Sequence, residues 1–189
     1  ISKWRTFFPF PTHRTRALCT KWHNNVKALR GAVPPRVQMA CILAGCNGWP
    51  TARRTGKVAK CPLCRKYKDD ISHIVKCSSV REAAKAMGIT SQDEDPWYAL
   101  FLAKQFDSNS AMTAAAFLTF AVYEACNSGR HLTSAPICGD DIVRHAKLAG
   151  FGAAKPPDSK RAKFTPSEDM VKRMRDHPDV FPLPKQRRR

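Results

Sequence analysis

Four residues with metal-binding side chains lie close together in the sequence: Cys61, Cys64, His73 and Cys77. Thiolates and imidazoles are the ligands that zinc prefers, and a Cys-x2-Cys pair lets two thiolates approach one ion from a tight turn. His73 and Cys77 are four residues apart, a spacing that predicts one face of a helical turn. Because four protein ligands leave no open coordination position, the pattern predicts one structural zinc ion rather than a zinc that activates water. The alternative, four unrelated buried residues, requires two half-motifs to arise side by side by chance.

The charge of the chain indicates the class of its partner. It has 33 Lys and Arg against 15 Asp and Glu, a net charge of +18 over 189 residues. Residues 1–68 hold fifteen basic residues and no acidic one, whereas residues 69–154 hold seven basic and ten acidic residues. A long segment without carboxylates suits continuous contact with phosphates, so we expect a nucleic-acid partner. The alternatives are an anionic membrane surface and a solvated basic face. No apolar run is long enough to span a membrane.

Basic residues of the two terminal segments and of the region around residues 61–77 are the candidate nucleic-acid contacts. They are Lys3, Arg5, Arg14, Arg16, Lys57, Lys60, Arg65, Lys66, Lys68, Lys160, Arg161, Lys163, Arg187, Arg188 and Arg189. We expect no membrane partner and no small-molecule substrate.

The cysteines outside the metal pattern bear on the cellular compartment. Five remain, Cys19, Cys41, Cys46, Cys126 and Cys138, and an odd number cannot pair completely in disulfides. This favours a reducing compartment, with three of them (41, 46 and 126) expected as buried free thiols in apolar helical runs. A chain that starts at Ile rather than Met is also compatible with a removed targeting segment. Both features are compatible with the mitochondrion, which we take as the expected location.

The elements that must position these residues are predicted to be helices. Helical apolar spacing and Pro or Gly boundaries predict helices over residues 16–30, 35–44, 80–87, 95–106, 110–126 and 142–148. Residues 114–122 are nearly all apolar, so their helix is expected at the centre, packed against residues 37–44 and 97–106. The aromatic residues of this region are expected to be core packing.

The predicted fold class is mainly α: a small helical domain, residues 16–150, built around a Cys-Cys-His-Cys zinc knuckle at residues 61–77. An extended basic and aromatic arm, residues 1–15, precedes it. A basic C-terminal extension, residues 151–189, follows with one short helix predicted from the capping pattern Thr165-Pro-Ser-Glu.

The pair Asp140-Asp141 superficially resembles the paired aspartates of a polymerase. It follows the knuckle and directly precedes the amphipathic residues 142–148. We therefore expect one of these aspartates to cap that helix.

The turn that precedes the knuckle completes a recognisable pattern. The run Asn47-Gly-Trp-Pro-Thr-Ala-Arg-Arg54, followed by the knuckle, resembles the zinc-binding region near the C-terminus of non-LTR retrotransposon reverse transcriptases. The resemblance covers about residues 35–132. It implies that the chain contacts nucleic acid. It also implies that Cys61, Cys64, His73 and Cys77 are the zinc ligands and that Arg53 and Arg54 contact phosphates. Retroviral knuckles match less well, because they place four residues rather than eight between the second Cys and the His.

The departures from that family decide the expected function. A polymerase needs carboxylates that hold two metal ions, and residues 1–68 contain none, so no palm is present and we expect no enzyme. The sequence predicts a non-catalytic, zinc-stabilised RNA-binding structural subunit of a large ribonucleoprotein, derived from a retroelement. A mitochondrial ribosome is the expected assembly, with ribosomal RNA and neighbouring proteins as partners.

The alternative is a nucleic-acid-binding C-terminal fragment of a reverse transcriptase polyprotein, which polymerase motifs upstream in the reading frame would select. A transcription regulator fits less well, because one knuckle offers no repeated base readout.

Overall fold

The described part of the chain is built from helices. The computed structural model describes residues 12–46, 48, 49, 51, 59–89, 100–131 and 135–153. The chain divides into two compact units, residues 1–153 and 154–189, and all described residues belong to the first. The helices are α2 (Thr12–Ala28), α3 (Pro35–Gly45), α5 (Ile71–Ile74), α6 (Ser78–Ala86), α8 (Asn109–His131) and α9 (Gly139–Leu148). No β-strand occurs among the described residues, and the predicted mainly α fold class is confirmed.

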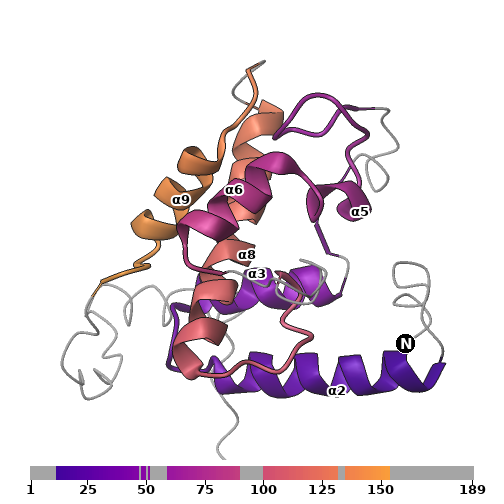
Figure 1. Ribbon diagram of the computed structural model, residues 1–189, viewed down its shortest axis with the longest axis vertical. Coiled ribbons are helices and arrows are strands. Elements are labelled where there is room, and N and C mark those ends of the chain that lie inside the picture. Colours follow the sequence, from indigo (N-terminus) through magenta and orange to yellow (C-terminus); the bar gives the residue numbers. More distant parts are fainter. Residues whose placement is uncertain are drawn as a thin grey trace, which may run out of the picture. The chain divides into compact units, whose positions relative to one another are not determined.

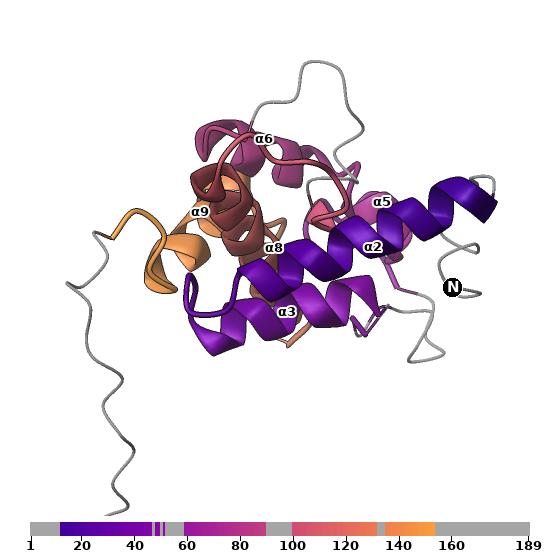
Figure 2. The same cartoon turned by 90° about the horizontal axis from the view of Figure 1, so that it is seen from below.

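Helices α2 and α3 lie side by side (Figure 2). Gly31 has a φ of +79°, which lets the chain reverse after α2, and Pro35 opens α3 at its first position, as predicted. The two helices approach closely at Gly45, where a Cβ atom would lie 2.3 Å from Cε2 of Trp22. Helix α2 begins at Thr12, inside the segment predicted to be an extended arm. The remainder of that arm, residues 1–11, lies outside the described residues.

Helix α8 is the central element, and its packing against α3 confirms part of the prediction (Figure 1). It continues five residues beyond the predicted end at 126. Its small and apolar residues Ala115, Ala116, Phe117 and Val122 are all buried. Helix α9 packs against both α8 and α6, which closes the opposite side of the core. None of the described helices has the length and apolar character that a membrane crossing requires.

The predicted helix over residues 95–106 is wrong at its C-terminal end. Residues 101–106 are not helical, and Leu102 has a φ of +53°. The carbonyls of this segment are satisfied by side chains from other elements. Thr119 Oγ1 donates to Leu100 O at 2.6 Å, and Asn25 Nδ2 donates to the carbonyls of Leu102 and Lys104 at 2.7 and 2.9 Å. Because these bonds replace helical ones, these three carbonyls keep hydrogen-bond partners where the segment leaves the helix. Residues 95–99 lie outside the described residues.

Helix α9 begins with the cap that the sequence predicted. The Asp141 carboxylate accepts hydrogen bonds from the backbone N–H and the thiol of Cys138, at 3.3 and 3.2 Å. The Cys138 thiol and backbone lower the pKa of Asp141 through these bonds. The interpretation of this aspartate as a helix cap is confirmed.

The described aromatic side chains of this region pack in or against the core, as expected, whereas Trp97 and Tyr98 lie outside the described residues. Phe101, Phe117 and Phe120 are buried. Trp49 is 1% exposed, and its ring centroid lies 5.9 Å from that of Tyr123.

Candidate metal centre

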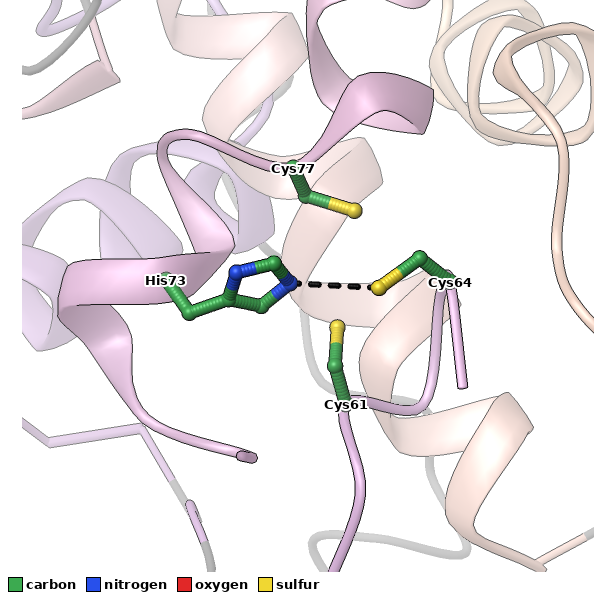
Figure 3. Close-up of side chains that lie close together, drawn as sticks. All are labelled: Cys61, Cys64, His73 and Cys77. Carbon is green, nitrogen blue, oxygen red and sulfur yellow. Dashed lines mark hydrogen bonds between the residues drawn. The ribbon is translucent and has the colours of Figure 1, made fainter. Parts of the chain in front are cut away.

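The four predicted metal ligands converge on one point. The ligand atoms of Cys61, Cys64, His73 and Cys77 all lie within 4.8 Å of one another. Figure 3 shows the three sulfur atoms and the imidazole turned toward a common centre, with His73 Nε2 3.2 Å from Cys64 Sγ. All three cysteines are buried, two of them completely.

The ligands come from three successive pieces of backbone. Cys61 and Cys64 lie in the turn before α5, His73 lies within α5, and Cys77 is the N-cap residue of α6. The predicted single helical turn joining His73 to Cys77 is therefore wrong. Helix α5 ends at Ile74, and Cys77 has an extended backbone with a ψ of 135°, from which α6 starts in a new direction.

Backbone hydrogen bonds fix the turn that carries the first two cysteines. Arg65 N donates to Cys61 O at 2.9 Å, and Cys61 N donates to Tyr67 O at 2.6 Å. Arg65 has a φ of +59°, the left-handed conformation that closes such a turn. On the other side of the centre, the Asp70 carboxylate accepts the backbone N–H of His73 at 2.8 Å and caps α5.

A buried ion pair attaches this turn to the central helix. The Asp69 side chain is 2% exposed, and Arg130 of α8 binds it through Nε at 3.2 Å and Nη2 at 3.1 Å. Arg65 Nη2 donates to Gly129 O at 2.6 Å, and Ile137 N donates to Leu63 O at 2.8 Å. Sequence reasoning missed this docking contact. The two charged partners are 61 residues apart, and no local pattern connects them.

The donor set suits a metal ion such as zinc. Three thiols and one imidazole are soft and borderline ligands. In a tetrahedral site with Zn–S bonds of about 2.3 Å, neighbouring sulfurs lie about 3.8 Å apart, which the observed spread accommodates. The hydrogen bond from the Cys61 thiol lowers the pKa of Cys77 to about 5, and the same bond raises the pKa of Cys61. This hydrogen bond therefore favours the thiolate form of Cys77, which is the form that binds a metal ion. The cluster can hold one metal ion.

The other candidate site residues fall into three groups. Arg16, Lys60, Lys66 and Lys68 are exposed, and Arg14 lies within α2. Arg65 is half-buried, and its guanidinium forms a hydrogen bond with the backbone of α8. This side chain therefore contributes to the packing of the fold. The rest lie outside the described residues: Lys3, Arg5, Arg53, Arg54, Lys57, Lys160, Arg161, Lys163, Arg187, Arg188 and Arg189.

All eight cysteines are free thiols. Cys41 and Cys126 are buried as predicted, whereas Cys46 is exposed, which corrects the prediction for that residue. It caps the C-terminus of α3, one position beyond the last buried residue of that helix.

Comparison of the chain with family models, with curated proteins and with solved structures found no match.

Proposed function

We propose that this protein is a non-catalytic, zinc-stabilised RNA-binding subunit of a large ribonucleoprotein. The observation that carries the proposal is the closed metal cluster beside an exposed basic surface. Four protein side chains supply the ligands, so a bound ion has no position left for water or substrate. Such an ion stabilises the fold instead of performing chemistry.

Zinc is the proposed ion because of the ligand types. Three cysteines and one histidine make one of the usual structural zinc sets, and hard cations such as Mg²⁺ prefer oxygen ligands. The ion would tie the turn at Cys61 and Cys64 to helices α5 and α6, which are too short to be stable alone. Its binding free energy is then available to the fold.

RNA is the proposed partner because of the charge. The net charge of +18 repels itself in the free protein and is relieved by contact with a polyanion. Basic segments at both ends of the sequence, around a helical domain, suit an assembly in which such segments become ordered between RNA helices. The resemblance to the zinc-binding region of retrotransposon reverse transcriptases supports a retroelement origin. On this proposal the assembly is a mitochondrial ribosome, and the chain contacts ribosomal RNA and neighbouring ribosomal proteins.

Native sedimentation tests the proposed function. The tagged protein is sedimented from gently lysed cells and from isolated mitochondria, and the co-migrating RNA and proteins are sequenced and identified by mass spectrometry. We expect co-migration with ribosomal RNA and ribosomal proteins, lost after nuclease treatment. A protein that sediments alone, with the same profile before and after nuclease, contradicts the proposal.

The same experiment separates the alternative function. A nucleic-acid-binding fragment of a reverse transcriptase polyprotein, favoured by the pattern of residues 47–54 before the knuckle, would migrate in a small complex with retroelement RNA and a polymerase. Sequencing the transcript would then show polymerase motifs in the same reading frame.

A further inference from the structure

An aromatic ring lies exposed at the edge of the metal centre. Tyr67 is 63% exposed, which is unusual for a residue with so large a ring. One face packs on the imidazole of His73, with ring centroids 4.8 Å apart and an angle of 37° between the ring planes. The Tyr67 carbonyl accepts the hydrogen bond from Cys61 N. One metal ligand therefore holds the Tyr67 backbone and another packs on its ring, so the ring loses little conformational freedom when something binds its open face.

Three exposed lysines lie near Tyr67 in the sequence. Lys60, Lys66 and Lys68 are all exposed, and the first and last are paired in an antiparallel bridge. Residues opposite each other in such a bridge have neighbouring side chains, and two like charges there repel. No ion pair joins these lysines to an acidic side chain of the described residues. A nearby polyanion would relieve the repulsion.

The two acidic residues that follow are already engaged. Asp69 is buried against Arg130, and Asp70 caps α5 through the N–H of His73. Asp69 is therefore neutralised by Arg130 and Asp70 is engaged in the helix cap, so neither carboxylate forms an ion pair with Lys60, Lys66 or Lys68.

We propose that Tyr67, Lys60, Lys66 and Lys68, here called the Tyr67 platform, bind single-stranded RNA. An unpaired base stacks on the open face of the tyrosine ring, and the lysines contact the flanking phosphates. Duplex RNA does not fit, because its base faces are covered by stacking. A protein partner fits less well, since lysine is depleted at protein interfaces. This inference rests on the proposed RNA-binding function and names the part of the RNA that the knuckle contacts.

Affinity measurements with a defined RNA test the inference. The full-length, zinc-loaded protein is titrated into a short fluorescein-labelled oligouridylate and into a duplex of the same length. We expect Tyr67→Leu to weaken binding of the single strand by roughly 5- to 150-fold, because one stacked base is lost. Tyr67→Phe should bind like the wild type. Leucine still covers the imidazole of His73, so a bound zinc content equal to that of the wild type shows that the metal centre is intact.

The salt dependence of RNA affinity distinguishes the contribution of the Tyr67 ring from that of the lysines. Stacking releases no counterions, so Tyr67→Leu should leave the slope of log affinity against log salt unchanged. The double variant Lys60→Gln and Lys68→Gln should reduce the slope by about 1.4 for a single strand. Met39→Ala, a change at an exposed apolar residue of α3, is the control and should alter neither quantity. Photocrosslinking with 5-iodouridine-substituted RNA should place a crosslink on Tyr67.

The outcomes separate this inference from the proposed function. Salt-dependent RNA binding that Tyr67→Leu leaves unchanged overturns the platform and leaves the proposed function standing, with the ring then available to a protein surface. If Tyr67→Leu weakens the binding of the single strand and of the duplex equally, that result also overturns the platform. A wild-type protein that binds neither RNA overturns both.

Discussion

Burial gives the eight cysteines different reactivities. Cys41 and Cys126 lie within the core, and burial raises the pKa of each to about 12. Because the thiolate is the reactive form, a thiol with so high a pKa stays unreactive at any pH at which the protein is handled. Cys46 and Cys138 are exposed, and Cys19 is half-buried, where burial raises the pKa of its thiol. The three cysteines of the knuckle are also buried, but their thiols converge with His73 on a site that can hold a metal ion.

Alkylation followed by peptide mass spectrometry checks this division. With zinc-loaded protein at about pH 8, iodoacetamide should modify Cys46 and Cys138. After a chelator is added, the three knuckle cysteines should react as well. Cys41 and Cys126 should react only in denaturant. Because burial raises their pKa, a moderate rise in pH should not make them react. Modification of either in the folded, zinc-loaded protein would show that the core is more open than the structure has it.

The metal ligands could be predicted from the sequence because their signal is local. The types and spacing of Cys61, Cys64, His73 and Cys77 define the set without any knowledge of the fold. The role of Arg65 could not be found in this way. A basic residue in a basic run predicts a phosphate contact, whereas its left-handed backbone and its bond to Gly129 O turn the side chain toward α8.

At the scale of elements, local patterns predicted where most helices lie and long-range bonds decided where they end. Pro35 and Gly31 were sufficient to place the boundary between α2 and α3. The helix predicted to reach residue 106 instead ends near Leu100, because Asn25 and Thr119 satisfy the carbonyls of that segment. These partners lie 77, 79 and 19 residues away, so no window of sequence contains the information.

The contact between α2 and α3 should require glycine at position 45. A Cβ atom there would lie 2.3 to 2.5 Å from three atoms of the Trp22 ring, so the ring or the helix must move. Alanine favours a helix by about 1 kcal/mol over glycine, but overpacking costs about 1–3 kcal/mol. We expect Gly45→Ala to lower the free energy of unfolding, measured in urea. The double variant with Trp22→Leu should recover part of the loss. A more stable Gly45→Ala variant would contradict the close approach.

The buried ion pair that attaches the knuckle to α8 should contribute far more stability than an exposed ion pair within α9. Arg130→Ala leaves Asp69 as a buried charge without its guanidinium partner, which typically costs about 3–5 kcal/mol. Arg144 forms a pair of similar length with Asp141, but its side chain is 71% exposed, so Arg144→Ala should cost less than about 1 kcal/mol. Urea unfolding of both variants measures the difference. Equal and small losses in the free energy of unfolding of the two variants would mean that other contacts hold the knuckle against α8.

At the scale of the whole molecule, the metal centre lies where three parts of the described chain meet. The turn at Cys61 bonds to Gly129 and Arg130 near the end of α8 through residues 65 and 69. Leu63 O accepts the N–H of Ile137 just before α9, and Cys77 begins α6. Since α6 and α9 pack together and α9 packs on α8, the centre and the helical core support each other.

Removal of the metal should therefore loosen more than the knuckle. A structural zinc ion supplies about 10–16 kcal/mol in isolated peptides, as much as the entire stability of a typical domain, so its loss cannot be absorbed locally. We expect a chelator, or Cys61→Ser, to speed amide hydrogen exchange in residues 61–77, in the last turn of α8 and at Ile137. Exchange in α3, which packs on α8 and α2, should change least. Cys46→Ser, an exposed cysteine outside the cluster, should leave exchange and zinc content unaltered. If exchange rises only within residues 61–77, the knuckle is an independent module, and the bonds to Gly129, Arg130 and Ile137 do not transmit the loss of the ion.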